Sequence, residues 1–577
     1  MVVLQALGWL LAGLLLALAC LIIYGFHPIK RWRYRKFPGP RPRWLIGNLL
    51  EIHTEGQEGA AERWAAEYGP LFLIWLGGFP VLMTADPALA KKVLARPARH
   101  KIWILHEGVE KHYEDHTLFF ANGERWRASR AAWQPFFSRQ SLQGHAAFMA
   151  RSAEALCRLL GSAARSGQQV DIWKSVQSLT IDVVGINAFG VDFNTLASPE
   201  TNGQEAPEEA APLKPSAVAE PAAAAADKAG SRPRSLRSAS TEALLGAVRT
   251  VFEVCGPAQP LFGLCFIFPE AEPVIRWLIN RWPNSVFRRE LWARQVVKAV
   301  GAELLHVSRQ ADAAAPAANG KPAQQVQQAQ QVQQVQQQSV RPPAVDSGSF
   351  LANVGRHTGK TLDGGVVLDD AWATNQATTF LVAGYETTAN AITFTVYLLA
   401  RNPDKEAKLL AEIDAFGRDR VPTLDDVEAH FPYAAAVLKE SMRLYAPSIT
   451  LMREAPAAGP WQLGSYDVPP GTALQVSMHA MHRSPELWQQ PLAFLPERFV
   501  SGSSEAEEVV PGAFIPFGAG SRMCVGMRFA EQTALLTLIR LYQQFTFRLL
   551  PGQVPLKTKV LITQGPIEGV HVTVHHR

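Results

Sequence analysis

One cysteine in a glycine-rich loop constrains this chain more than any other feature of its sequence. The loop runs from Phe517 to Gly526 and places Cys524 directly before a helical pattern that extends to Ile539. A helix N-terminus carries unpaired N–H groups and a partial positive charge, and both stabilise a thiolate relative to a thiol. We therefore expect Cys524 to be a thiolate, the form in which cysteine binds soft or borderline metal ions.

The surroundings of Cys524 favour one kind of metal site. Zinc sites usually bring three or four Cys and His ligands in paired spacings, and no second Cys or His lies near Cys524. A single thiolate suffices where a macrocycle supplies the other ligands, as in haem. Gly518 and Gly520 would let the loop backbone lie against a flat ring, and Gly526 would let the helix start approach it. For a lone cysteine, the alternative is a structural residue beside a turn.

The same loop resembles the haem-binding signature of the cytochrome P-450 superfamily, Phe-x-x-Gly-x-Arg-x-Cys-x-Gly. All five typed positions match, at Phe517, Gly520, Arg522, Cys524 and Gly526. The resemblance implies that Cys524 is the axial ligand of the iron in haem b. It also implies that Arg522 reaches a haem propionate and that Phe517 shields the sulfur from water. Five specific matches outweigh the structural-cysteine alternative.

A second stretch resembles the family's Trp-x-x-x-Arg motif. Trp126 and Arg130 are four residues apart, so one helix face carries both. The indole N–H and the guanidinium could each bind a propionate, because arginine suits carboxylates. Arg453, ten residues after Arg443, matches another propionate-binding arginine of several family members.

Two consecutive aspartates can cap a helix that runs from residue 371 to about 401. Its middle, from Ala383 to Thr388, resembles the family's Ala/Gly-Gly-x-Asp/Glu-Thr motif, which lies over the iron. Gly384 and Thr387 share a helix face and could loosen the helix for a small ligand. The resemblance implies that Thr387 and Glu386 are catalytic: Thr387 would stabilise the oxygen species bound to the iron, and Glu386 would help relay protons through water. A threonine-rich core helix is the alternative.

A buried ion-pair network is expected in the last third of the chain. Glu440 and Arg443 form a Glu-x-x-Arg pattern on one helix face, and Arg498 follows in a Phe-Leu-Pro-Glu-Arg-Phe stretch. We assign these three residues to folding and haem retention, because removing one would leave an unpaired buried charge. An ordinary surface pair is the alternative.

Composition excludes some classes of protein. The chain has 577 residues and a net charge of +5 that is not gathered into a nucleic-acid footprint, so we expect no nucleic-acid partner. The five cysteines are scattered, which argues against a disulfide framework and for a reducing compartment. Residues 196–240, rich in Ala, Pro, Glu and Ser, and residues 310–349, rich in Gln, lack the apolar residues of a core. Both are predicted to be disordered insertions.

The N-terminus predicts a membrane anchor. Residues 6–26 contain no charged residue, so residues 1–26 are predicted to be a transmembrane signal-anchor. Basic residues follow without an acid, which keeps this flank and the body of the protein cytosolic. A cleaved signal peptide is the alternative, but no basic residue precedes the apolar run. Residues 27–48 form a basic, proline-rich connector that resembles the hinge of microsomal family members.

Several further elements are predicted. Strands at 71–76 and 81–84 form a hairpin, another strand covers 473–480, and helices cover 60–68, 241–254 and 284–308. The apolar segment 260–268 matches a region of the family that touches the membrane. In this chain it is either a second membrane contact or core.

Together these features predict a mainly α fold with a smaller β-rich part, the cytochrome P-450 fold, preceded by one transmembrane helix. Residues 49–577 would form the haem-thiolate domain, and the run from 514 to 548 most resembles the clan of the animal family 3 enzymes. The implied protein lies in the endoplasmic reticulum membrane with a single pass and a cytosolic catalytic domain.

The implied activity is that of a haem-thiolate monooxygenase. It would insert one oxygen atom into a hydrophobic small molecule of sterol, terpenoid, carotenoid-derived or fatty-acid type. Electrons would come from NADPH through a separate cytochrome reductase, because no flavin or nicotinamide domain has room in this chain. The alternatives are a haem-thiolate isomerase or dehydratase that needs no reductase, and a non-catalytic haem sensor or scaffold.

Overall fold

The computed structural model describes residues 9, 13, 15, 27–96, 117–196, 238–254, 260–268, 271–314, 350–361, 367–459, 461–560 and 562–577. The predicted anchor at 1–26 and the predicted insertions at 196–240 and 310–349 lie almost wholly outside these residues. Among the described helices, none combines the length and the apolar character that a membrane span requires.

The described chain is mainly helical, as predicted. Its α-helices are α2 (Pro28–Tyr34), α3 (Leu49–Tyr68), α4 (Pro87–Leu94), α6 (Gly123–Trp133), α7 (Arg139–Ser166), α8 (Ile172–Val184), α9 (Ser238–Val254), α10 (Pro260–Ile267), α11 (Glu272–Arg281), α12 (Ser285–Ala314), α14 (Phe350–Gly355), α15 (Asp370–Arg401), α16 (Pro403–Phe416), α17 (Leu424–His430), α18 (Pro432–Leu444), α19 (Met478–Arg483), α20 (Ser504–Glu507) and α21 (Met527–Gln544). Short helical turns are η2 (Gln134–Phe137), η3 (Gly185–Phe189), η7 (Pro496–Phe499) and η8 (Gly520–Arg522).

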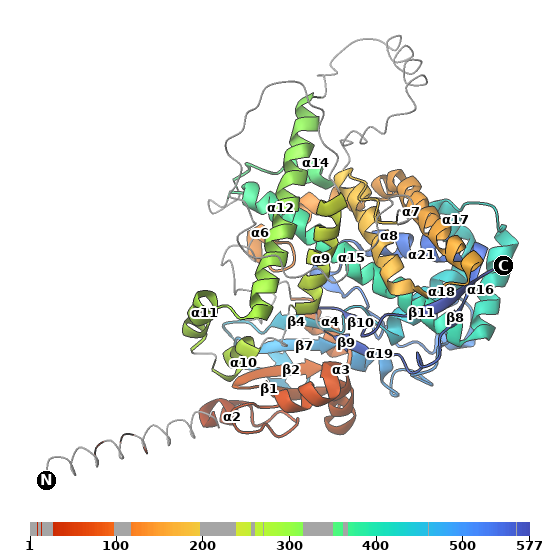
Figure 1. The fold of residues 1–577 in the computed structure, drawn as a ribbon. Helices are drawn as coiled ribbons and strands as arrows, with labels where there is room; N and C mark the ends of the chain where they lie inside the picture. The colour runs from red at the N-terminus through yellow and green to blue at the C-terminus, as the bar shows by residue number, and fades with distance from the viewer. Residues whose placement is uncertain are drawn as a thin grey trace.

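The strands make up a smaller share of the described chain and are divided among several small sheets. They are β1 (Leu71–Leu76), β2 (Phe79–Thr84), β3 (Val170–Asp171), β4 (Thr450–Glu454), β5 (Gln462–Leu463), β6 (Tyr466–Asp467), β7 (Ala473–Ser477), β8 (Phe545–Leu549), β9 (Thr558–Val560), β10 (Gln564–Pro566) and β11 (His571–His576). The largest sheet has the order β1-β2-β7-β4. Figure 1 shows it below the helical part, with α3 against it.

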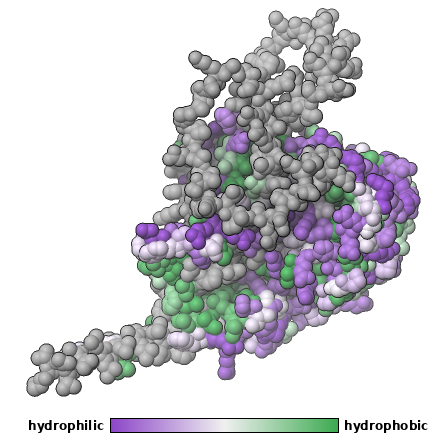
Figure 2. Space-filling view, viewed as in Figure 1, coloured by the Kyte–Doolittle hydropathy of each residue, from purple (hydrophilic) through white to green (hydrophobic). Residues whose placement is uncertain are grey.

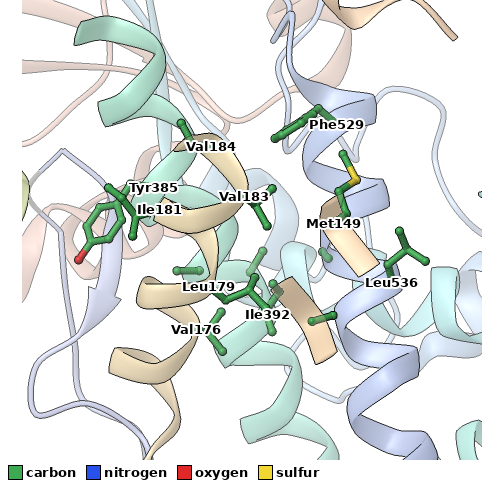
Figure 3. Packing of buried hydrophobic residues seen from close by; sticks show 14 of the residues in the cluster. Met149, Val176, Leu179, Ile181, Val183, Val184, Tyr385, Ile392, Phe529 and Leu536 are labelled. Carbon is green, nitrogen blue, oxygen red and sulfur yellow. The ribbon is translucent and has the colours of Figure 1, made fainter. Parts of the chain in front are cut away.

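The helix α15 runs through the centre of the helical part (Figure 1). Small and apolar residues surround most of its circumference, and such a helix is stable only when other helices cover it. The helices α8, α12, α18 and α21 pack on it. Asp369 caps its start as predicted, because the carboxylate accepts a hydrogen bond from the Trp372 N–H at 2.8 Å. Figure 3 shows the apolar packing between α8, α15 and α21.

Gly384 allows α8 and α15 to approach each other closely. A Cβ added at this position would lie 2.6 Å from Cγ2 of Val184, inside van der Waals contact. The helix α15 is continuous through this residue. The glycine therefore makes room for a neighbouring helix, and the expectation that it also loosens α15 for a small ligand stays a prediction.

The predicted hairpin is confirmed. The strands β1 and β2 pair antiparallel, with Leu73 opposite Leu82, and β2 pairs in parallel with β7. The strand β7 ends at Ser477, three residues earlier than predicted. The cause is a helix cap, because the Ser477 hydroxyl accepts a hydrogen bond from the Ala480 N–H and starts α19.

The segment predicted as a hinge covers the edge of β1. The N–H of Leu73 donates to the Pro38 carbonyl at 2.8 Å, and the N–H of Trp75 donates to the Asn48 side chain at 2.9 Å. Tyr34 is buried, and its hydroxyl forms a 2.8 Å hydrogen bond with Thr472. These contacts fix residues 34–48 to the sheet and satisfy an edge that would otherwise be open.

The apolar segment 260–268 forms α10, in which Cys265 and Phe266 are buried. The Phe266 carbonyl accepts a hydrogen bond from Gly78 at 3.0 Å, in the turn between β1 and β2. This part of the segment is therefore core. The next helix, α11, instead exposes Trp277 and Val274.

We predict that Gly384→Ala lowers the free energy of unfolding. Alanine favours a helix by up to about 1 kcal/mol over glycine, but overpacking in a core costs about 1–3 kcal/mol. Adding Val184→Ala relieves the clash, so the double variant should lose less stability than the sum of the single variants. The measurement is chemical denaturation of the three variants.

The matched control is Gly144→Ala in the exposed part of α7, where nothing lies within 4 Å of an added Cβ. This substitution should raise stability. Equal gains at Gly144 and Gly384 would show that α8 and α15 are not in close contact.

Candidate haem site

A cavity of about 290 Å³ lies between α15 and the Cys524 loop. From α15 it is lined by Ala383 and Thr387, and from the loop by Phe517 and Cys524. Most of the remaining wall is apolar and comes from α6, α18, α21 and the segments around residues 118 and 448. The structure thus brings together the motifs that the sequence singles out.

The loop geometry places Cys524 two residues before the cap of α21, as predicted. The Cys524 N–H donates to the Phe517 carbonyl at 2.9 Å and closes the loop. Gly520 has a φ of 75°, and a Cβ there would lie 2.4 Å from the Leu94 carbonyl oxygen at the end of α4. Only glycine fits this position, because both the backbone angle and the contact exclude a side chain.

The helix α6 holds the loop from the other side. The guanidinium of Arg130 donates to the Met523 carbonyl at 2.8 Å, next to Cys524. Arg522 donates to the Ala121 carbonyl at 2.7 Å, and its guanidinium lies 4.5 Å from the centre of the Trp126 ring. The motif of Trp126 and Arg130 and the loop of Arg522 therefore hold each other in place, and both line the cavity.

Three guanidiniums gather beside the cavity, of which Arg453 and Arg522 are buried and Arg130 is half-buried. Burial lowers the pKa of Arg522 to about 10, with further contributions from Arg453 and Arg130. Burial also lowers the pKa of Arg453 to about 10 and lowers that of Arg130. Within the described residues, neither Arg130 nor Arg453 forms an ion pair with a carboxylate. A cluster of positive charges favours the binding of anions, and the two propionates of haem would provide them.

Arg453 takes a different place from the other two. It does not line the cavity, and its guanidinium donates to the carbonyls of Arg96 at 2.9 Å and Met452 at 2.8 Å. Its positive charge contributes to the lowered pKa of Arg522, which does line the cavity. The cavity walls, the thiol and the arginine cluster together fit haem, with Cys524 as the residue that would ligate the iron.

The predicted catalytic pair is divided between two faces of α15. Thr387 lines the large cavity, and its hydroxyl donates to the Ala383 carbonyl at 2.8 Å. Glu386 instead faces a second, smaller cavity. Burial raises the pKa of Glu386 to about 7, against the opposing effects of Thr563, Asn390 and Lys559. Neighbouring residues on a helix do not face each other, so the acid and the hydroxyl are not in direct contact.

The structure forms the predicted three-charge network. The carboxylate of Glu440 lies 2.8 Å from Arg443 and 3.4 Å from Arg498, and both partners are buried. Arg443 also donates to the carbonyls of His482 and Pro491, each at 2.7 Å. Burial is the main cause of the lowered pKa of Arg498, and Glu440 opposes it.

His482 is a residue that sequence reasoning missed. Its Nε2 accepts a hydrogen bond from the Ile515 N–H at 3.1 Å, so it connects the ion-pair network to the start of the cysteine loop. Burial lowers the pKa of His482 to about 3, and this keeps the ring neutral and able to accept. No sequence signal marks His482, because its partner is a backbone group 33 residues away.

Two indole hydrogen bonds, also missed, join α6 to α15. Trp133 donates to the Gln376 side chain and Trp372 donates to the Ser129 hydroxyl, each at 2.9 Å. Glu531 on α21 was missed as well. It contributes a carboxylate to the cavity wall, and burial raises its pKa.

Comparison with known proteins decides the family. The family model described as Cytochrome P450 matches residues 37–209 and 322–568, which is most of the chain. The chain belongs to the cytochrome P450 family. Its fold is the P450 fold, and its site is that of a haem-thiolate enzyme.

Relatives cover nearly the whole chain. Thromboxane-A synthase of Macaca fascicularis is 27% identical over 93% of this P450 and 91% of its own length. Cytochrome P450 3A5 of Homo sapiens is 25% identical over 97% and 94%, and cytochrome P450 3A29 of Sus scrofa is 26% identical over 95% and 92%. The predicted resemblance to the clan of the animal family 3 enzymes is confirmed.

We predict that Glu440→Gln lowers the free energy of unfolding by roughly 3–5 kcal/mol, because it leaves two buried guanidiniums without a carboxylate. Denaturation of the purified P450 measures the loss. The control is Asp425→Asn, which breaks the exposed pair with Arg139 and should cost less than about 1 kcal/mol. Similar losses in the two variants would show that the network does not stabilise the fold.

We predict that His482 makes the fold less stable in acid. The unfolded chain binds a proton at His482 below about pH 6.5, whereas the folded chain binds one only near pH 3. Between these values the contribution of His482 falls by up to about 1.4 kcal/mol for each pH unit lost. The measurement is unfolding free energy between pH 7 and pH 5.

The His482→Gln variant should show a shallower dependence on pH. Identical slopes in wild type and His482→Gln would contradict the neutral, buried ring.

Proposed function

We propose that this P450 is a monooxygenase that inserts one atom of dioxygen into a hydrophobic small molecule. Electrons come from NADPH through a separate cytochrome reductase. One observation carries the proposal: the hydroxyl of Thr387 lines the same cavity as the thiol of Cys524. A synthase-type rearrangement has less need of a hydroxyl at this position than a reaction that consumes protons.

Different residues of the protein have different roles in the proposed reaction. The apolar wall binds and dehydrates the substrate, which favours sterols, terpenoids, carotenoid-derived molecules or fatty acids. The Thr387 hydroxyl donates to a backbone carbonyl, so its lone pairs remain available to accept a hydrogen bond from a donor bound in the cavity. Haem, when bound through Cys524, supplies the activation of dioxygen.

Glu386 would supply protons to this site from behind Thr387. Its pKa of about 7 allows it to hold and release a proton near neutral pH. Because it faces the second cavity, proton transfer to Thr387 requires rotation of its side chain or an intervening water.

The second candidate function is an isomerase or dehydratase that needs no reductase. The names of the relatives divide between a synthase and cytochromes P450, and this division supports the candidate. The presence of Glu386 with Thr387 favours the monooxygenase.

An exposed apolar face supports attachment to a membrane, which we assign to the endoplasmic reticulum with the catalytic domain in the cytosol. We define this face by the exposed side chains of Ile29, Trp32, Leu264, Trp277 and Trp282. Figure 1 places α2, α10 and α11 on the left side of the molecule, and Figure 2 shows hydrophobic residues gathered in the lower part of this side. Tryptophan suits the boundary between lipid and water.

We predict a strongly red-shifted Soret band for the reduced, carbon-monoxide-bound protein, because a thiolate ligates the iron. The Cys524→Ala variant should lose this band. The control is Cys157→Ala, since Cys157 is buried on α7 and does not line the cavity. A thiolate-type band in Cys524→Ala would overturn the ligand assignment.

NADPH consumption with an added reductase separates the candidate functions. A monooxygenase converts substrate only with reductase and NADPH, and Thr387→Ala should reduce the product formed per NADPH consumed. Full turnover without reductase would favour the isomerase or dehydratase.

A further inference from the structure

A second cavity, of about 20 Å³, lies on a different face of α15 from the haem site. Its walls come from α8, α9, α15 and the hairpin of β9 and β10. It shares no lining residue with the large cavity. Tyr385 and Glu386 face it from α15, and Gln177 faces it from α8.

Three buried polar atoms around this cavity lack a well-formed hydrogen bond within the protein, although Arg249 lies near the Tyr385 hydroxyl and lowers its pKa against the effect of burial. They are the hydroxyl of Tyr385, Oε2 of Glu386 and Oε1 of Gln177. All three side chains are more than nine-tenths buried. Figure 3 shows the Tyr385 hydroxyl turned away from the apolar side chains of α8. Leaving such groups unsatisfied is costly, so a partner that is not protein is expected.

The backbone of β10 leaves the space open. A Cβ added at Gly565 would lie 3.5 Å from Oε1 of Glu386 and 3.4 Å from Nδ2 of Asn390. Asn390 itself is engaged, because it accepts from Trp173 at 2.7 Å and donates to the Gln564 carbonyl at 2.8 Å. Hydrogen bonds of Asn390 therefore fix the residues around the cavity. The polar atoms that face the cavity itself remain available to a bound molecule.

We propose that this cavity binds one ordered water molecule, held by Tyr385, Glu386 and Gln177. One water needs about 10–15 Å³ and two to four polar partners, and the cavity meets both conditions. The water would donate its two hydrogens to the oxygens of Gln177 and Glu386 and would accept the hydrogen of Tyr385.

Other occupants fit less well. A cation would meet Arg249 and Lys559, whose positive charges line the same cavity and offset the carboxylates of Glu253 and Glu386. An organic ligand is excluded by the volume. The bound water holds the Glu386 carboxyl on the face of α15 that is turned away from the haem site. The proposal does not depend on which reaction the haem site performs.

The test begins with Tyr385→Phe. If a water is bound, it loses a partner, and the thermal midpoint shifts downward. If the cavity is dry, the substitution removes an unsatisfied hydroxyl, and the midpoint shifts upward. The matched control is Tyr542→Phe, because the Tyr542 hydroxyl is also buried without a partner but lines neither cavity. This control should not lower the midpoint. A rise in both variants would overturn the proposal.

A high-resolution crystal structure gives a second readout that does not depend on stability. The expected result is one density peak within hydrogen-bond distance of the three oxygens. Gly565→Ala should remove this peak, because the added methyl group occupies the space. An empty cavity in the wild-type protein would refute the water site.

Discussion

The buried pairing of Glu440 with Arg443 is the interaction on which the rest of the haem site depends. Desolvating two charges is expensive, so the pair is stable only when every remaining hydrogen-bonding position is satisfied. Arg443 meets this demand through the carbonyls of His482 and Pro491, and Glu440 meets it by accepting from the Leu495 N–H at 3.0 Å. The pair therefore holds the irregular segment between α19 and η7 in place against α18.

Hydrogen bonds from neighbouring elements also hold the cysteine loop in place. His482 accepts from Ile515 at the entrance of the loop, and Arg130 binds the Met523 carbonyl from the side of α6. The loop is thus fixed at both ends by groups that lie far from it in sequence. Cys524 can face a flat cofactor without any secondary structure of its own, because the rigidity is supplied by its neighbours.

The sequence predicted those parts of the site that depend on short sequence motifs. Cys524 lies before its helix, Trp126 and Arg130 share one helix, and Arg498 joins Glu440, because each depends on local spacing or on a motif of the family. The direction of Glu386 was not predictable, since it depends on how α8, α9 and β10 surround the helix. The role of Gly384 in helix packing was not predictable for the same reason, because its neighbour Val184 is 200 positions away. The placement of residues 1–26 was not tested by the described residues.

The contact of residues 34–48 with the edge of β1 has a mechanical consequence. A flexible connector would let the body of the protein rotate freely relative to α2. Here the buried Tyr34, at the end of α2, and the hydrogen bond from Leu73 to Pro38 join this helix to the sheet as one rigid piece. Under the proposed membrane attachment, the exposed side chains of Trp277 and Trp282 would therefore keep a fixed orientation relative to α2.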